Sequence, residues 1–192
     1  MMVSTNVIDG VDINALTTMV EAVRNDHNLA RVTFRANSQW QGGCLVSSQI
    51  APMTQGGDTD TGRAGKFTMT SDHPPSLLGS DEAPTPAEYL LQGLAGCLAC
   101  NIVATAASRG VELESYSCEV ETDFDVASLF LGITAGITAE RGSGAQEFRA
   151  KLKIVAPKAS REEIEAVVKA GQERSPVTNT LARAAKVVVT LE

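Results

Sequence analysis

The segment spanning residues 86–107 restricts the fold of this chain more than any other. Its few polar residues are Glu88, Gln92, Asn101 and Thr105. A helix that is apolar nearly all round has to be covered nearly all round, so the segment predicts a central, buried helix. Its start is marked by Thr85-Pro86-Ala87-Glu88, which combines an N-cap hydroxyl, proline at the first helical position and Glu at the third, and so forms a capping box.

A transmembrane span is the competing interpretation of this segment. Two glycines, Gln92 and Asn101 dilute its hydrophobicity, and no basic flank follows it. We therefore expect a core helix and no membrane association. Because one small sheet cannot cover such a helix on every side, we also expect a homodimer that buries it between subunits.

The rest of the chain predicts strands in hairpins and helices in blocks. An amphipathic helix is expected over 12–27, strands over 31–36, 44–50 and 66–70, and a loop over 54–65. After the long helix, alternating strands cover 116–124 and 148–154, a helix capped by Ser160 runs to about Arg174, and 186–191 forms a last strand. This order indicates an antiparallel α+β fold, with an N-terminal helical extension over 1–29 and the main domain over 30–192.

Charge and cysteine content exclude several classes of partner. The formal net charge of -7, with Lys and Arg scattered, argues against binding nucleic acid. The N-terminus lacks the features of a secretion signal, so we expect a cytoplasmic protein whose four cysteines are free thiols. With His27 and His73 far from any cysteine pair, we expect no metal and no cofactor.

Two longer motifs resemble a known family. The run Ala83-Pro84-Thr85-Pro86-Ala87-Glu88-Tyr89-Leu90-Leu91-Gln92-Gly93-Leu94-Ala95-Gly96-Cys97-Leu98, followed by residues 106–112, is similar to the OsmC/Ohr family of osmotically inducible and organic-hydroperoxide-resistance proteins. Residues 40–43 and 174–181 support the likeness, which spans most of 30–192. The resemblance implies an OsmC-like fold, an intertwined homodimer with two central helices, and a site between subunits where a helix cysteine reduces organic peroxides.

The same resemblance also shows where this chain departs from the peroxide-reducing members. Cys97 matches the cysteine that peroxide attacks, but Ser175 stands where the family has its resolving cysteine. Ala87 stands at the position of the family's glutamate, with Glu88 one place later, and Gln41 or its neighbours stand at the position of its arginine. Three of the four positions that carry the family's chemistry therefore differ.

Three residues are candidates for the site. Cys97 can act only as a thiolate, which apolar neighbours disfavour and an arginine within about 4 to 6 Å would favour. Cys100 lies one turn later and could replace the resolving thiol, although side chains at that spacing diverge. Glu88 could hold an arginine or a peroxide, although the capping box already accounts for it. For each of the two cysteines, packing in the core is the alternative.

Two functions follow from these candidates. The first is an OsmC-like enzyme, a thiol-dependent organic hydroperoxide reductase in which Cys97 reacts with a small lipophilic peroxide and an external thiol regenerates it. Cys100 would be the second resolving candidate. The alternative is a non-catalytic homodimer that binds a small apolar ligand at the subunit interface, which the lost positions favour.

Overall fold

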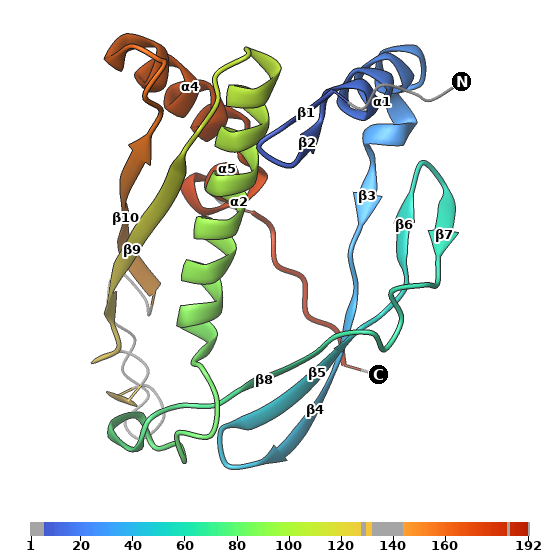
Figure 1. Cartoon of the computed structure of the whole chain (residues 1–192). Helices are drawn as coiled ribbons and strands as arrows, with labels where there is room; N and C mark the ends of the chain where they lie inside the picture. Colours follow the sequence, from blue (N-terminus) through green and yellow to red (C-terminus); the bar gives the residue numbers. More distant parts are fainter. Residues whose placement is uncertain (1–5, 128–129, 132–143, 184, 192) are drawn as a thin grey trace. The chain divides into compact units, whose positions relative to one another are not determined.

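A computed structural model describes residues 6–127, 130–131, 144–183 and 185–191. These residues form two compact units, 1–90 and 91–192, and each is described by itself. The long helix α2 (Pro86–Ser108) begins at the end of the first unit and continues into the second (Figure 1). The predicted division between residues 29 and 30 stays a prediction.

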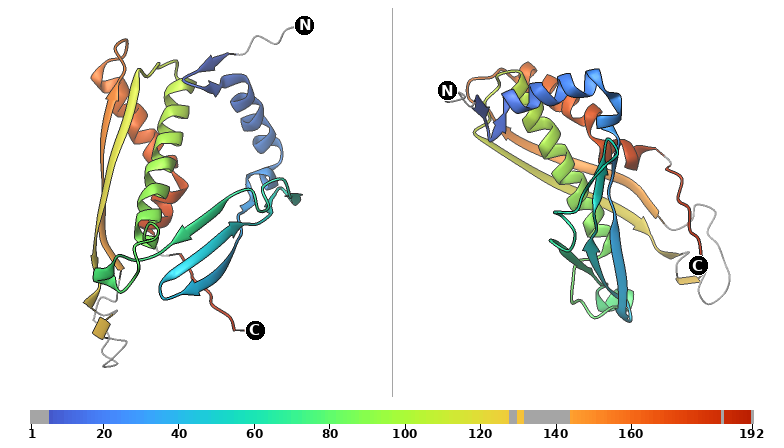
Figure 2. Two further views of the ribbon diagram at one scale, coloured as in Figure 1. Left: turned by 60° about the horizontal axis from the view of Figure 1, so that its bottom comes forward. Right: turned by 90° about the vertical axis from the view of Figure 1, so that its right-hand side faces the viewer.

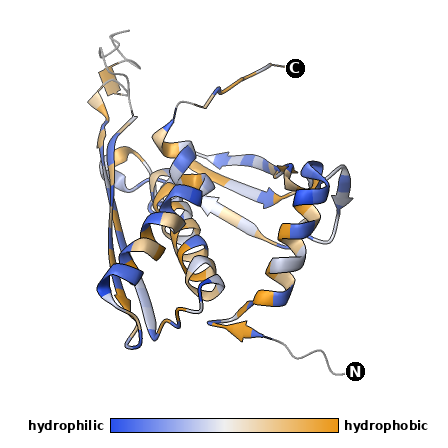
Figure 3. Cartoon of the chain, turned by 90° about the horizontal axis from the view of Figure 1, so that it is seen from above, coloured by the Kyte–Doolittle hydropathy of each residue, from blue (hydrophilic) through white to orange (hydrophobic). Residues whose placement is uncertain are grey.

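The first unit opens with a small hairpin and a helix. Strands β1 (Val7–Ile8) and β2 (Val11–Asp12) pair antiparallel and lead directly into α1 (Ile13–Asn25). The Asp12 carboxylate accepts a hydrogen bond of 3.0 Å from the N–H of Ala15, which is an N-cap. Figure 3 shows both hydrophobic and hydrophilic residues along α1, none of which is buried. The predicted N-terminal helix is thus confirmed, without the packing expected for its apolar residues.

The sheets of the first unit are antiparallel, as predicted. Strands β4 (Ala36–Gly42), β5 (Leu45–Ile50) and β8 (Thr68–Ser71) form one sheet in the order β4-β5-β8. The turn between β4 and β5 uses Gly42 and Gly43, whose φ angles of 122° and 53° suit glycine. Two short 3-10 helices, η1 (His27–Ala30) and η2 (Pro75–Leu77), complete the unit together with a second small sheet.

That second sheet corrects one prediction. It contains β3 (Val32–Thr33), β6 (Met53–Gln55) and β7 (Asp58–Asp60), in the order β3-β6-β7. The region 54–65, predicted to be a loop, therefore contains a tight hairpin. Gly56 and Gly57, at φ 61° and 99°, make the turn between its strands. The strands in this Thr-, Asp- and Gly-rich region are too short to show an alternation of apolar and polar residues, so the sequence did not indicate them.

The second unit contains two long strands packed with α2 and with two helices near the end of the chain. Strands β9 (Ser115–Asp125) and β10 (Gly144–Val155) pair antiparallel, and α2 lies alongside them in both Figure 1 and Figure 2. The predicted alternation is confirmed, because six half-buried side chains pack against the core: Tyr116, Cys118, Val120, Phe148, Leu152 and Ile154. On the outward side, Arg149 forms ion pairs with Glu121, Asp123 and Glu147.

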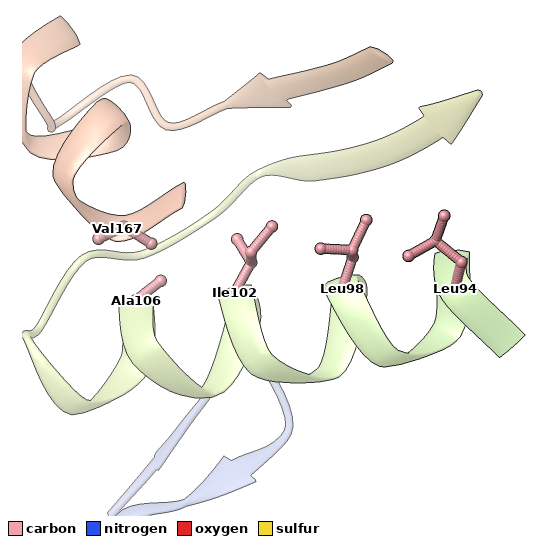
Figure 4. Close-up of a cluster of buried hydrophobic side chains, with 5 residues drawn as sticks. All are labelled: Leu94, Leu98, Ile102, Ala106 and Val167. Carbon is pink, nitrogen blue, oxygen red and sulfur yellow. The ribbon is translucent and has the colours of Figure 1, made fainter. Parts of the chain in front are cut away.

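The core of this unit is a stripe along α2. Figure 4 shows Leu94, Leu98, Ile102 and Ala106 extending from one face of the helix, with Val167 of α4 (Arg161–Arg174) beside them. Helix α4 starts as predicted, because Ser160 and Glu163 form a capping box. It comes close to α2 at Gly171, where an added Cβ would lie 2.8 Å from the Cα of Ile102. Only glycine permits this contact.

The single chain buries only part of α2, and the predicted burial of the remainder between two subunits stays a prediction. All of its buried residues except Ala107 share one face, whereas Leu90 is 42% exposed and Cys100 is also exposed. By length and composition alone α2 could cross a membrane. Its buried stripe instead packs against protein, as in the core helix predicted from the sequence.

The end of the chain differs from the prediction in two ways. A short helix, α5 (Pro176–Ala182), follows α4 and was not predicted. Residues 185–191 are extended but form no strand with any described residue. Four large apolar side chains in this segment are 67% to 100% exposed: Val187, Val188, Val189 and Leu191. Figure 3 shows hydrophobic stretches leading to the C-terminus.

Candidate active site

Cys97 lies in the middle of α2, and its sulfur accepts two hydrogen bonds. The Ser175 Oγ donates to the Cys97 Sγ over 3.2 Å. The Nδ2 of Asn101, one helical turn after Cys97, lies 3.5 Å from the same sulfur and also donates to the Cys97 carbonyl oxygen over 2.8 Å. Within the described residues, both hydrogen-bond donors to this sulfur are uncharged. The side chain is half-buried, which leaves part of it accessible.

Ser175 reaches Cys97 because it links two helices. It is the C-cap of α4, through an N–H bond of 3.1 Å to the Gln172 carbonyl, and the N-cap of α5. Pro176 follows at the first position of α5, where its missing N–H has no cost. Ser175 is completely buried, at 0% exposure. A polar side chain so buried needs partners, and the hydroxyl has them in Cys97 and Thr178.

Asn179 stabilises the junction between α4 and α5. Its Nδ2 donates to the carbonyl oxygens of Glu173 and Ser175, in both cases over 3.0 Å. The Glu173 carbonyl lies in the last turn of α4, where C=O groups have no partner within the helix, whereas the Ser175 carbonyl also accepts the backbone N–H of Asn179 over 3.0 Å. The side chain therefore fixes the direction in which the chain leaves α4, and with it the place of the Ser175 hydroxyl.

A cavity of about 480 Å³ is present in the second unit. It is lined by residues of α2, β10, α4 and α5. Its apolar lining includes Leu94, Leu98 and Phe148, and its polar lining includes Gln146, Glu147 and Gln172. Thr178 also lines this cavity, and its hydroxyl donates to the Ser175 Oγ over 2.8 Å. A volume of this size suits a small organic molecule. The cavity and the sulfur are thus connected by two hydroxyl groups.

The other two predicted site residues lie apart from this arrangement of hydrogen bonds. Cys100 is exposed, and it and Cys97 are both free thiols. The Glu88 carboxylate accepts hydrogen bonds from the N–H of Thr85 over 2.7 Å and from its hydroxyl over 2.9 Å. The first of these bonds, and then the second, hold the pKa of Glu88 below its usual value. The capping box is confirmed, and a role for Glu88 in holding a peroxide or an arginine stays a prediction.

The positions at which the family's arginine and glutamate were expected can also be located. Gln41 is an exposed residue of β4, and Ala87 is the second residue of α2. Arg35, an arginine of the first unit, donates to the Pro52 carbonyl over 3.3 Å within that unit. In the described part of the chain, no group of three or more His, Cys, Asp or Glu side chains is placed to hold a metal ion.

Two residues of this arrangement were not singled out from the sequence. Asn101 could have been found, because a spacing of four places it on the same helix face as Cys97. Thr178 follows the Ser-Pro pair as Glu88 follows the Thr-Pro pair at the start of α2, so the N-cap signature was visible. Its contact with the cavity depends on tertiary packing and gave no sequence signal.

Comparisons with known proteins agree with this architecture. The structure resembles an organic hydroperoxide resistance protein OsmC from Legionella pneumophila, with 21% identity, a TM-score of 0.56 and coverage of 78% of this chain and 88% of that one. It also resembles an OsmC-like protein from Mycoplasma pneumoniae, with 18% identity, a TM-score of 0.55 and coverage of 79% and 87%. An organic hydroperoxide resistance protein from Elizabethkingia anophelis, crystallised with thiocyanate, gives 16% identity, a TM-score of 0.53 and coverage of 77% and 86%. A comparison with curated proteins gives no match.

These likenesses define the class of fold, an α+β arrangement of antiparallel sheets with one long helix. A model of the family of OsmC-like proteins matches residues 79–190, which include α2, the β9–β10 pair and the α4–α5 junction. The chain belongs to the OsmC-like protein family.

Proposed function

We propose that this protein reduces organic hydroperoxides with Cys97 as the attacking thiol. The observation that carries the proposal is the Cys97 sulfur, which accepts hydrogen bonds from Ser175 and Asn101 at one end of a hydroxyl chain that begins in an apolar cavity. Hydrogen-bond donors stabilise a thiolate more than a thiol, and the thiolate is the nucleophile. The cavity would take the organic part of a lipophilic peroxide.

The proposed reaction has two halves. The Cys97 thiolate attacks the outer oxygen of the hydroperoxide, an S–O bond forms as the O–O bond breaks, and the leaving alkoxide takes up a proton to become an alcohol. Cys97 is then a sulfenic acid. One external thiol condenses with it to give a mixed disulfide and water, and a second external thiol releases the Cys97 thiol and an external disulfide.

An external reductant is proposed because Ser175 offers an oxygen where a disulfide needs a sulfur. Cys100 is the second candidate for resolving the sulfenic acid. Its exposed side chain is accessible to small thiols, whereas the helix backbone between it and Cys97 resists the movement that a disulfide would require. The cytoplasm, where we propose the protein works, supplies small thiols at a reducing potential.

Peroxide consumption tests this function. Purified protein is mixed with an alkyl hydroperoxide and a dithiol, and peroxide loss is followed for wild type, Cys97→Ser and Cys44→Ser. Cys97→Ser should fall to the rate of buffer and dithiol alone. Cys44→Ser should match wild type, because Cys44 only donates to the Leu78 carbonyl in the first unit and serine can do the same.

Equal rates in wild type and Cys97→Ser would exclude the enzymatic function. They would favour the second candidate, a non-catalytic dimer that binds a small apolar ligand, which the cavity of about 480 Å³ supports. In that case, wild type and Cys97→Ser should both bind a non-reactive alkyl alcohol, which calorimetry would measure.

We further propose that the protein is a homodimer. The support is the C-terminal segment, in which Val187 is 84% exposed and Val189 is 88% exposed on an extended, unpaired chain. Such a strand normally pairs with a sheet edge, and exposed apolar surface of this kind is covered in a stable assembly. The exposed face of α2 has the same need for cover.

Sedimentation velocity tests the dimer. Wild type should sediment as a dimer at micromolar concentration, and a Val187→Lys/Val189→Lys variant should shift towards the monomer, because lysines cannot be buried there without loss of their hydration. Lys186→Ala, next to these residues but not apolar, should leave the dimer intact. A monomeric wild type would contradict the proposal.

A further inference from the structure

The Ser175 hydroxyl has a fixed orientation, and Thr178 sets it. A hydroxyl has two acceptor lone pairs and one hydrogen to donate. The Ser175 Oγ accepts from the Thr178 N–H over 3.2 Å and from the Thr178 hydroxyl over 2.8 Å. Both lone pairs are therefore occupied. The remaining hydrogen can go only to the Cys97 sulfur, which lies 3.2 Å away.

Asn101 imposes the same direction from α2. Its side-chain nitrogen carries two hydrogens and no acceptor lone pair. One hydrogen is given to the Cys97 carbonyl oxygen over 2.8 Å and the other points to the Cys97 sulfur at 3.5 Å. Ser175 and Asn101 therefore each direct a hydrogen at the Cys97 sulfur, so both side chains approach it as donors.

We propose that Thr178 is a positioning residue for the reactivity of Cys97, because it forces Ser175 to donate its only hydrogen to the sulfur. The proposal rests on the proposed function for its biological meaning. It explains how a family member with serine at this position can still present a nucleophilic sulfur. Ser175 then has a role of its own in the site, because it stabilises the thiolate with a neutral donor.

The position of Thr178 links the chain of hydrogen bonds from Thr178 through Ser175 to Cys97 with the cavity. Thr178 is half-buried and lines the cavity of about 480 Å³, and its hydroxyl is the first member of the chain that ends at Cys97. A molecule in the cavity would lie against the residue that orients Ser175. The sulfur would then respond to occupation of the cavity without being one of its lining residues.

The test measures the reactivity of Cys97 without any peroxide. Full-length protein is alkylated with iodoacetamide at neutral pH, and modification of the peptide that contains Cys97 is followed by mass spectrometry. Thr178→Val, which keeps the shape but removes the hydroxyl, should slow alkylation by roughly three- to tenfold. The range corresponds to the loss of about one hydrogen bond to the sulfur.

Matched variants separate this role from a structural one. Thr178→Ser restores a hydroxyl and should return alkylation to the wild-type rate. Ser175→Ala and Asn101→Ala each remove one donor to the sulfur and should slow alkylation as Thr178→Val does. Thr180→Val should stay within about twofold of wild type, because the Thr180 hydroxyl donates to the Pro176 carbonyl on the same helix and is exposed.

Each result decides between the two proposals. A wild-type rate in Thr178→Val, or a Thr178→Ser variant as slow as Thr178→Val, would overturn the positioning role. If Thr178→Val does not fold, equal rates for Ser175→Ala, Asn101→Ala and wild type overturn it instead. Slow alkylation in these variants together with a wild-type protein that consumes no peroxide would uphold the positioning role and reject the proposed function.

Discussion

A Ser175→Cys variant should form a disulfide with Cys97 when it is treated with one equivalent of an oxidant. In the native protein the Ser175 oxygen and the Cys97 sulfur are already 3.2 Å apart, on two helices held together by the core. A shift of about 1 Å would bring two sulfur atoms to bonding distance. Closing the long chain loop between residues 97 and 175 should stabilise the oxidised variant by up to about 4 kcal/mol, less any strain.

Intact mass and denaturant unfolding measure this result. The oxidised Ser175→Cys variant should lose the mass of two hydrogens and unfold at higher denaturant concentration than its reduced form. A Thr180→Cys variant places the new thiol on the exposed side of the same helix and should form no such bond. Stepwise gain of oxygen without a cross-link would contradict the juxtaposition of the two side chains.

Two oxidants make the outcome more informative. Diamide, which oxidises thiol pairs directly, tests the geometry alone. An alkyl hydroperoxide tests the geometry and the proposed attack by Cys97. If the disulfide forms with diamide but not with hydroperoxide, the described arrangement of the helices is supported and the proposed attack of Cys97 on peroxide is rejected.

The Gly171→Ala variant should be strongly destabilised. A Cβ at this position would lie 2.6 Å from the Cγ1 of Ile102 and 2.8 Å and 2.9 Å from its Cα and N. Two of these atoms are backbone, so no rotamer change relieves the contact, and α4 would have to move away from α2. Overpacking of this kind costs about 1 to 3 kcal/mol or more, which exceeds the gain in helix propensity from glycine to alanine.

The Gly171→Ala substitution should disturb the contact between Cys97 and Ser175 as well as the packing of the core. Gly171 lies one turn before Ser175, and Ile102 lies little more than one turn after Cys97, so the same helix contact sets the distance between the two side chains. For Gly171→Ala, the free energy of unfolding measured with a chemical denaturant should fall, and so should the rate of Cys97 alkylation. Lys169→Ala, an exposed change on the same helix, should stay within about 0.5 kcal/mol of wild type. Wild-type stability in Gly171→Ala would show that α4 does not pack on α2 as described.

Local patterns were sufficient to predict the larger elements. Thr85 with Glu88, and Ser160 alone, marked the starts of two helices because caps depend on neighbours in sequence. The alternation over 116–124 and 148–154 predicted the strands, because burial of one face imposes a period of two. The hairpin within 54–65 was too short for any period to appear.

The contacts that make the site depend on tertiary structure. Cys97 and Ser175 are 78 positions apart in sequence, and periodicity cannot place them together. The resemblance to the OsmC/Ohr family gave the pairing, and the structure gave its direction, through Thr178 and Asn101. The same holds for α2: its sequence indicated burial on all sides, whereas the single chain covers mainly one face, and we propose that a second subunit covers the rest.

The account depends on the Cys97 sulfur being the atom that peroxide attacks. The most direct measurement is to treat wild-type protein with one equivalent of an alkyl hydroperoxide in the presence of dimedone, which traps sulfenic acids, and to locate the adduct by peptide mass spectrometry. We predict that the adduct lies on Cys97 in most molecules, with little on exposed Cys100. An adduct mainly on Cys100, or no adduct while the protein is folded, would contradict the account.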